Sequence, residues 1–358
     1  MKALRQTAAV SAGLAMALAL ALAAGLAGAV QAAEIRVLNW KGYGTDEAWA
    51  VEAFEAATGH SVVHDYFNSE QEMLTKLRTN PGAYDVVLIN AAYTQQAAGE
   101  GLIQPIDTAG MANVVDLAPN LAGNPELAPE GVVHGVAWVW GLTGFAYNSD
   151  AIDPPDSLEV FWSAEMKGKI GWRDDALEAV QFAALATGQS INDIQDLDAV
   201  REKLAALIPQ IRTFWSSEND WNQFIASGEF DVATYWSGSA SRSKTQFGLP
   251  VEFVVPKEGA IGWLDGLSIP AGSQNVDAAK AFINWMIDPE FYVKWDTDVG
   301  APASANIKAA AALPEDAFNR VVLGDPDNIA RVEIMLPVPE EKMQAYLAMW
   351  QELKAEAQ

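Results

Sequence analysis

Residues 256–270 read Pro256-Lys-Glu-Gly-Ala-Ile-Gly-Trp-Leu-Asp-Gly-Leu-Ser-Ile-Pro270, and the part from Gly262 to Ile269 is typical of a β-strand. Within it, Trp263 and Asp265 stand two residues apart. Side chains alternate between the two faces of a strand, so this spacing places both of them on one face. An aromatic ring beside a carboxylate suits the binding of an organic cation. The alternative is a core tryptophan followed by Asp265 at the start of a turn before Gly266.

Strands and helices alternate on both sides of this segment, which is typical of βαβ units on a parallel sheet. Expected strands cover 34–40, 61–67, 85–89, 169–172, 212–214 and 232–235, and expected helices cover 46–58, 69–77, 93–100, a segment from Ala176, 196–208, a segment that ends at Gly228, 276–287, 289–297 and 339–355. The run 134–148 is too long for one ordinary strand. Together with 251–269 it predicts two crossings between lobes.

The fold class is therefore α/β, with two lobes joined by two hinge crossings and a ligand cleft between them. About 325 residues remain after the N-terminal segment, which exceeds the usual size of one hydrophobic core. We expect lobe 1 to comprise residues 33–138 and 264–310. We expect lobe 2 to comprise residues 142–260 and 313–358.

The first 32 residues have the pattern of a secretory signal peptide. Lys2 and Arg5 precede an apolar run from Val10 to Leu26, and Val30-Gln-Ala32 matches a small-residue cleavage site. An uncleaved membrane anchor is the alternative, because the run is nearly long enough to span a bilayer. The chain has no cysteine that could carry a lipid anchor. We therefore expect a mature protein in the periplasm.

The net charge and the absence of cysteine limit the kinds of ligand and partner that the protein can bind. The formal net charge is −25, and it becomes −27 once the two positive charges of Lys2 and Arg5 are removed. Such a charge repels nucleic acid and attracts cations, although it also serves solubility alone. The absence of cysteine excludes disulfides, cysteine-based zinc sites and a thiol nucleophile. We expect a monomer with a small-molecule ligand, no cofactor, no metal and no nucleic-acid partner.

Aromatic and acidic side chains follow the expected strands. In open α/β sheets, ligands bind beyond the carboxyl ends of the strands. The segments at those positions are Asn39-Trp40-Lys41-Gly42-Tyr43-Gly44, Asn90-Ala-Ala-Tyr93, Arg173-Asp-Asp-Ala-Leu-Glu178 and Trp236-Ser-Gly-Ser-Ala240. They predict a cleft lined by rings and carboxylates.

Asp175 and Glu178 have two competing interpretations. Their spacing at the start of a helix places them on one face, where they could receive the ammonium groups of a ligand. The same spacing fits an acidic capping box with Asp175 as the N-cap. Trp40 and Trp236 are also open to a second interpretation, because a chain with 13 tryptophans must bury some of them in its core.

Catalytic patterns are weak in this sequence. His60, His64 and His134 are the only histidines, and a His-x3-His spacing in a strand does not form a metal pair. The chain has no Gly-x-Ser-x-Gly elbow, no glycine-rich phosphate loop and no His-Glu-x-x-His. Asp175 and Glu178 lie on adjacent turns of one helix, which is a poor way to face each other across a glycosidic bond. An exported hydrolase is a remote alternative, and a purely structural role needs no such cleft.

Six segments occur in the order and spacing of a known family. They are Asn39-Trp40, Gly82-Ala-Tyr-Asp-Val-Val87, Trp140-Gly141, Asp174-Asp-Ala-Leu-Glu178, Tyr235-Trp-Ser-Gly-Ser-Ala240, and Pro256-Lys-Glu-Gly followed by Trp263-Leu-Asp265. Through them the chain resembles the periplasmic spermidine/putrescine-binding proteins that feed ABC importers, from about Ile35 to the C-terminal helix. The resemblance implies a periplasmic binding protein fold, a polyamine ligand and a permease partner in the inner membrane.

The resemblance also implies the ligand-binding residues. By position, an aromatic box would consist of Trp40, Tyr43, Trp236 and Trp263. The carboxylates that would receive ammonium groups are Asp175, Glu178 and Asp265. Further candidates beside the box are Lys41, Asn90 and Tyr93.

Three departures from the family pattern keep a second ligand class open. Lys41 stands where the family has a small polar residue, the segment Asn90-Ala-Ala-Tyr93 lacks a fuller hydroxyl-rich pattern, and Met335-Leu-Pro-Val338 offers no glutamine. A lysine beside the box would repel a polyamine, point to solvent or bind a ligand carboxylate. The alternative ligand is a zwitterion such as an ω-amino acid, a betaine or a sulfonium compound.

Overall fold

The computed structural model describes residues 32–356, so the expected signal peptide lies outside the described residues. The strands are β1 (Glu34–Asn39), β2 (Ser61–Tyr66), β3 (Val86–Asn90), β4 (Ile103–Gln104), β5 (Val136–Asn148), β6 (Ile170–Arg173), β7 (Ile211–Trp215), β8 (Val232–Trp236), β9 (Val251–Val254), β10 (Ala260–Pro270), β11 (Ala303–Ser304) and β12 (Val332–Ile334). The helices are α2 (Ala48–Thr58), α3 (Glu70–Thr79), α4 (Ala91–Gly99), α5 (Pro119–Ala122), α6 (Ala176–Ala186), α7 (Leu197–Leu207), α8 (Glu218–Ala226), α9 (Ser237–Thr245), α10 (Val276–Met286), α11 (Pro289–Asp298), α12 (Ile307–Ala312), α13 (Phe318–Val321), α14 (Pro326–Ile329) and α15 (Glu340–Glu356).

Capping residues set the helix boundaries that matter for the cleft. Ser69 accepts a hydrogen bond from the backbone N–H of Glu72 and begins α3, as the capping pattern predicts. Asn90 begins α4 in the same way by accepting from the N–H of Ala92. Gly59 ends α2 with a φ of 75°, a conformation that favours glycine. Each of these helices therefore starts or stops within a few residues of a strand end.

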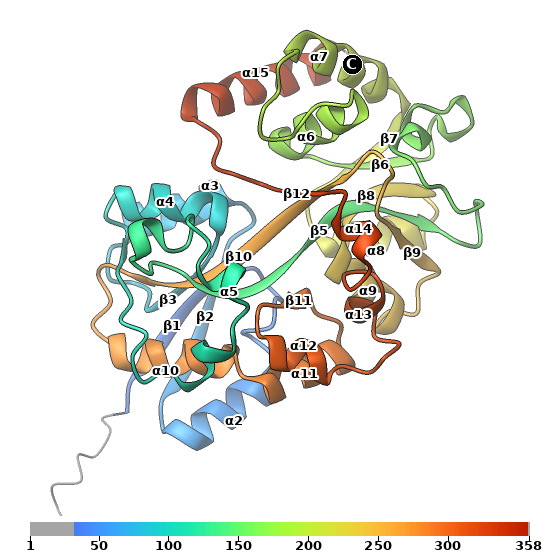
Figure 1. The fold of residues 1–358 in the computed structure, drawn as a ribbon. Coiled ribbons are helices and arrows are strands. Elements are labelled where there is room, and N and C mark those ends of the chain that lie inside the picture. The colour runs from blue at the N-terminus through green and yellow to red at the C-terminus, as the bar shows by residue number, and fades with distance from the viewer. Residues whose placement is uncertain (1–31, 357–358) are drawn as a thin grey trace, which may run out of the picture.

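One sheet runs through both halves of the molecule, in the order β2-β1-β3-β10-β5-β8-β6-β7. Strand β1 is parallel to β2 and β3, and β6 is parallel to β7 and β8. The expected parallel units are thus confirmed on both sides. Between them β10 runs antiparallel to both β3 and β5, and β5 runs antiparallel to β8 (Figure 1).

The two predicted crossings are the long strands β5 and β10. They pair from Ile261 with Thr143 to Leu267 with Val136, and the register shifts between Asp265 and Gly266. Strand β5 pairs with β8 from Thr143 to Tyr147, and β10 pairs with β3 from Asp265 to Ser268. Figure 1 shows both strands passing diagonally from one half of the molecule to the other.

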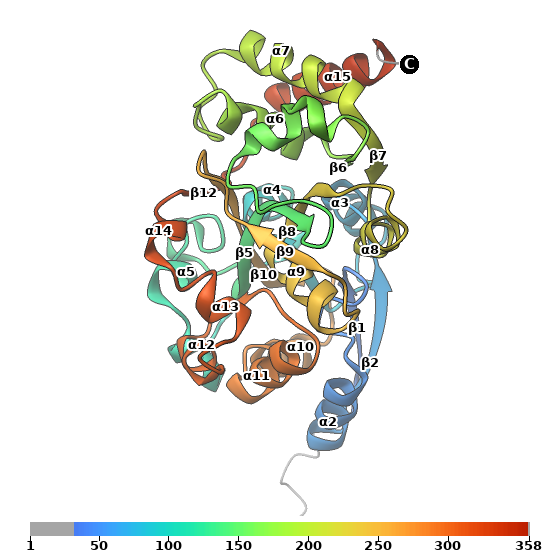
Figure 2. The same ribbon diagram turned by 90° about the vertical axis from the view of Figure 1, so that its right-hand side faces the viewer.

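The apolar core divides at the same two strands. One cluster of buried side chains draws on residues 35–139 and 264–313, and a second draws on 145–232, Ile261 and 346–353. Helices α6, α7 and α15 lie together at one end of the molecule in Figure 2, although α15 is far away in the sequence. The lobe boundaries of 33–138 plus 264–310 and 142–260 plus 313–358 remain a proposal.

Within residues 32–356, none of the helices combines the length and the apolar character that crossing a bilayer requires.

Candidate functional site

Asp265 lies at the centre of the β5–β10 pairing and is only 6% exposed. The hydroxyl of Tyr43 donates to Oδ2 at 2.8 Å, and Nδ2 of Asn90 donates to Oδ1 at 3.0 Å. Burial raises the pKa of Asp265 to about 6, although both hydrogen bonds oppose that shift. Among the described residues, no cationic side chain forms an ion pair with Asp265. The result is a buried carboxyl group held only by neutral donors.

The turn after β1 directs Tyr43 toward this carboxylate. Gly42 and Gly44 adopt φ values of 72° and 78°, and residues other than glycine rarely adopt such values. Gly44 also lies against the ring of Trp295, where a Cβ would come within 2.7 Å. Asn39 fastens the turn by donating from Nδ2 to the carbonyl of Tyr43 at 3.0 Å. The glycine-rich segment is therefore a turn that directs the tyrosine toward Asp265.

Trp263 shares a face of β10 with Asp265, as the spacing predicts. The pairing with β5 is regular from Ile261 to Asp265, so the alternation of side chains is unbroken between them. The indole is half-buried and lies against Gly141, where a Cβ would come within 2.5 Å of the ring. Strand β10 continues through Gly266, so the alternative of a turn there is wrong.

A second group of side chains gathers around Arg173 at the end of β6. Its Nη1 donates to Oε2 of Glu178 at 2.8 Å, and Nη2 lies 3.7 Å from Oδ2 of Asp175. The same guanidinium lies over the ring of Trp236, 4.8 Å from the centroid. Burial alone lowers the pKa of Arg173, but the charges of the two carboxylates outweigh it and raise that pKa. The arginine therefore stays charged at any ordinary pH.

The three acidic residues of this segment have separate partners. Asp174 accepts hydrogen bonds from Nε1 of Trp350 at 2.8 Å and from Nζ of Lys354 at 2.6 Å, and so fastens α15. Asp175 is the N-cap of α6 and accepts from the N–H of Glu178 at 2.9 Å. The capping interpretation of Asp175 is thus confirmed. Glu178 takes no part in the cap through its side chain and instead pairs with the arginine.

Glu70 adds a carboxylate that the sequence interpretation left without a role. It is the first residue of α3, and its Oε2 is shielded from solvent without a hydrogen-bond partner among the described residues. Burial raises the pKa of Glu70 to about 8, and the charge of Asp265 adds to the effect. The charges of Arg173 and Asp175 also reach it, the first lowering its pKa and the second raising it. Glu70 therefore lies within electrostatic range of both groups.

The remaining candidates lie around these two groups. The ring of Trp40 packs on Phe67 with centroids 4.5 Å apart, and it contacts the core of the first cluster. Tyr93 is partly buried, and burial first and the charge of Glu70 second raise its pKa. Lys41 is exposed at the turn after β1.

We call the set Asp265, Glu70, Tyr43, Asn90 and Trp263 the acidic end, and the set Arg173, Asp175, Glu178 and Trp236 the arginine end. Arg173 and Glu70 are the members that the sequence interpretation missed. Arg173 directly precedes the quoted acidic residues, and Glu70 follows the end of β2 at the same edge of the sheet as the other candidates. Both Arg173 and Glu70 lie within four residues of a strand end, which is the signal by which the sequence could have identified them.

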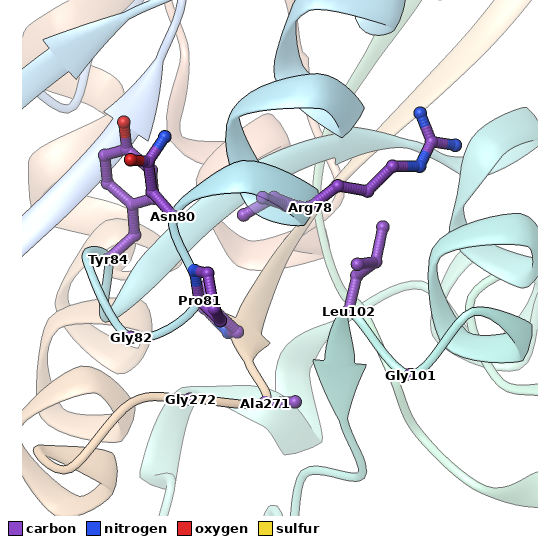
Figure 3. Close-up of a pocket in the computed structure, with 11 residues that line it drawn as sticks. Arg78, Asn80, Pro81, Gly82, Tyr84, Gly101, Leu102, Ala271 and Gly272 are labelled. Atoms are coloured by element: carbon purple, nitrogen blue, oxygen red, sulfur yellow. The ribbon is translucent and has the colours of Figure 1, made fainter.

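Two hollows elsewhere do not offer a better ligand site. The one in Figure 3 has a volume of about 80 Å³ and lies between the end of α3, the turn before β3 and the end of β10. The other has about 270 Å³ and lies beside Trp140, Tyr292 and Leu323. Sites for small molecules usually measure about 300–1,000 Å³. Neither hollow is lined by a residue of the acidic end or the arginine end.

Comparison with known proteins identifies the family of this chain. A family model described as bacterial extracellular solute-binding protein matches residues 49–319. A spermidine/putrescine-binding periplasmic protein of Salmonella typhimurium is 34% identical over 311 residues, which cover 85% of this chain and 87% of the relative. The protein of the same name from Escherichia coli is 33% identical over 289 residues, which cover 79% and 81%.

A solved structure has the same fold. It is the spermidine/putrescine ABC transporter substrate-binding protein PotD of Streptococcus pneumoniae, with a TM-score of 0.79 at 23% identity, covering 91% of this chain and 100% of that chain. The two-lobed periplasmic binding protein fold expected from the sequence is thereby confirmed. The chain belongs to the family of bacterial extracellular solute-binding proteins.

Proposed function

We propose that this protein is the periplasmic substrate-binding component of an ABC importer, which captures a polyamine such as putrescine or spermidine and delivers it to a permease in the inner membrane. The observation that carries the proposal is the carboxylate of Asp265, which is buried, held by two neutral donors and has an aromatic ring on the same face. A buried charge of this kind is costly unless a cation completes it. The names of the relatives support the choice of ligand.

The groups around Asp265 fit the two parts of a polyamine. Rings at Trp263, Tyr43 and Trp236 would cover the methylene chain and attract its charge through their faces. The carboxylates would accept charge-assisted hydrogen bonds from the ammonium groups. Trp40, Asp175, Asn90 and Tyr93 belong to the same proposal as contacts of lesser weight.

A zwitterion is the weaker candidate on physical grounds. Its carboxylate would need a cation in the cleft, and the guanidinium of Arg173 is already paired with Glu178. Lys41 is exposed beside the turn, where water screens its charge. A polyamine therefore remains the ligand that these charges favour.

The proposed mechanism is binding and lobe closure without chemistry. Each lobe contributes carboxylates and rings, so a ligand that contacts both lobes would stabilise their approach. We propose that the protein acts as a monomer and that its acidic charge raises the rate at which cationic ligands arrive.

Calorimetric titration with four compounds tests the function. These are putrescine, spermidine, an ω-amino acid and a quaternary ammonium zwitterion. We expect micromolar or tighter binding of at least one polyamine and none of the zwitterions. Binding of the betaine-type compound with no response to either polyamine would contradict the proposed ligand and leave the family assignment unchanged.

A further inference from the structure

Glu70 occupies a position that a helix-capping role does not explain. Glu70 is the first residue of α3, where its negative charge can interact favourably with the positive end of the helix dipole. Glu72 in the same turn supplies the same interaction. Glu72 accepts from the N–H of Asn68 at 2.9 Å and lies 3.6 Å from Lys76. Glu70, in contrast, has a shielded oxygen without any partner among residues 32–356. An acid that only stabilised the helix start would remain in water.

The surroundings of Glu70 come from five separate elements. Asp265 lies on β10, Arg173 on β6 and Asp175 at the start of α6, and the charge of each reaches Glu70. The charge of Glu70 also raises the pKa of Tyr43, in the turn after β1, and that of Tyr93 on α4. Glu70 therefore lies within electrostatic range of charged groups from several elements, and its charge adds to that of Asp265.

We propose that Glu70 is a further ligand-binding residue and that it forms, together with Asp265, the subsite for an ammonium group of the ligand. The inference rests on the proposed function and specifies where the cation lies. At the arginine end, the guanidinium of Arg173 already occupies the place beside Glu178 and over Trp236. At the acidic end, Oε2 of Glu70 is buried without a hydrogen-bond partner among residues 32–356, and the charge of Asp265 acts on this carboxyl group. The ammonium group completes the acidic end.

Proton release on binding follows from the same arrangement. Two carboxylates that share a site resist ionising together, and Glu70, with its pKa at about 8, holds a proton at neutral pH. An ammonium between them favours the ionised form. Binding below pH 8 therefore releases roughly one proton, and affinity rises as the pH increases from 6 to 8.

The stability of the free protein has the opposite dependence on pH. The pKa of Glu70 rises on folding from 4.5 to about 8, so the folded protein binds the proton more tightly than the unfolded chain. The free energy of unfolding contributed by this group falls as the pH rises through that window. Replacing Glu70 by glutamine removes this part of the dependence.

The test is calorimetric titration of putrescine into the wild type, Glu70→Gln and Glu72→Gln at pH 7, in two buffers with different ionisation enthalpies. The Glu72 variant is the matched control, because it removes a carboxylate from the same helical turn. We expect Glu70→Gln to weaken binding roughly ten- to hundredfold, as for a lost charge-assisted hydrogen bond, and to abolish most of the proton release. Glu72→Gln should keep both.

Thermal melting of each free variant shows that the fold is retained. A Glu70→Gln protein that binds putrescine as the wild type does, or that loses no more affinity than Glu72→Gln, overturns the inference. An unchanged proton release also overturns it, since Glu70 would not be the group that ionises. A wild type that binds neither putrescine nor spermidine overturns the proposed function itself, so the two failures are distinct.

Discussion

The acidic end and the arginine end contain the same kinds of residue and differ in what neutralises the carboxylates. At the acidic end, Asp265 is held by the neutral donors of Tyr43 and Asn90, and its charge remains available. At the arginine end, Glu178 is paired with Arg173, which also covers the ring of Trp236. A carboxylate beside a tryptophan therefore indicates a cation site, but only the structure shows whether the protein already supplies the cation.

Removal of Arg173 should have the largest effect, and it should act on stability. Glutamine at this position leaves Glu178 buried without its cation, which usually costs about 3–5 kcal/mol. We expect the free energy of unfolding of Arg173→Gln, measured in urea, to fall accordingly. The double variant Arg173→Gln/Glu178→Gln should recover much of the loss, because it removes both charges. A single variant as stable as the wild type would show that the pair does not matter.

Asp265→Asn should cause the largest loss of affinity. A buried charge that loses its partner costs about 2–5 kcal/mol, so putrescine binding should weaken by more than tenfold in calorimetric titration. The matched control is Asp85→Asn, since Asp85 is also buried and held by neutral donors, the hydroxyl of Ser273 and the N–H of Arg36. The control should change stability without changing affinity. Equal affinity losses in both variants would mean that the ligand responds to the total negative charge of the lobe and not to a contact with Asp265.

Replacing Trp263 at the acidic end should weaken ligand binding more than replacing Trp236 at the arginine end. Trp263→Ala should weaken polyamine binding by about 2 kcal/mol, the value of a desolvated cation–π contact. Trp236→Ala should weaken it less, because the ring already stacks on Arg173. Fluorescence titration of both variants measures the difference, and the melting temperature of each free variant serves as the control. A larger loss at Trp236 would place the ligand at the arginine end.

The smallest effect is expected at Lys41. Its exposure predicts that Lys41→Ala changes the affinity for putrescine by less than about threefold, in the direction of tighter binding, because a screened like charge is removed. Titration at low and at high salt should bring the variant and the wild type together as screening increases. Weaker binding of a zwitterion by the variant would show that the lysine contacts a ligand carboxylate.

Most of the fold could be predicted from local patterns. The alternation of strands and helices, the cap at Ser69 and the stop at Gly59 all depend on neighbouring residues, so the sequence contains them. Helix α9 was not predicted, because Ser237-Gly-Ser-Ala-Ser is a poor helix former. Distant contacts hold it: Arg242 pairs with Glu218 and donates to the carbonyl of Gly300, and Gly238 allows Pro302 to approach.

The strands that carry the candidate site could be predicted, and the pairing of its charges could not. The expected strand 262–269 contains Trp263 and Asp265, and the expected strand 232–235 ends just before Trp236; the structure has strands at both places. Whether Arg173 points toward Glu178 or toward solvent depends on side-chain packing that no short pattern encodes. The same holds for Glu70, because the capping pattern at the start of α3 involves Ser69 and Glu72 and says nothing of where the Glu70 side chain lies.

The irregular pairing between Asp265 and Gly266 has a mechanical consequence. A β-bulge bends the strand that carries it at one position and increases the local twist. We therefore expect the lobes to rotate about a point next to Asp265, where the lever arm is shortest. A ligand amine that reaches this carboxylate in the open protein would keep its contact while the distant walls travel several ångströms toward it.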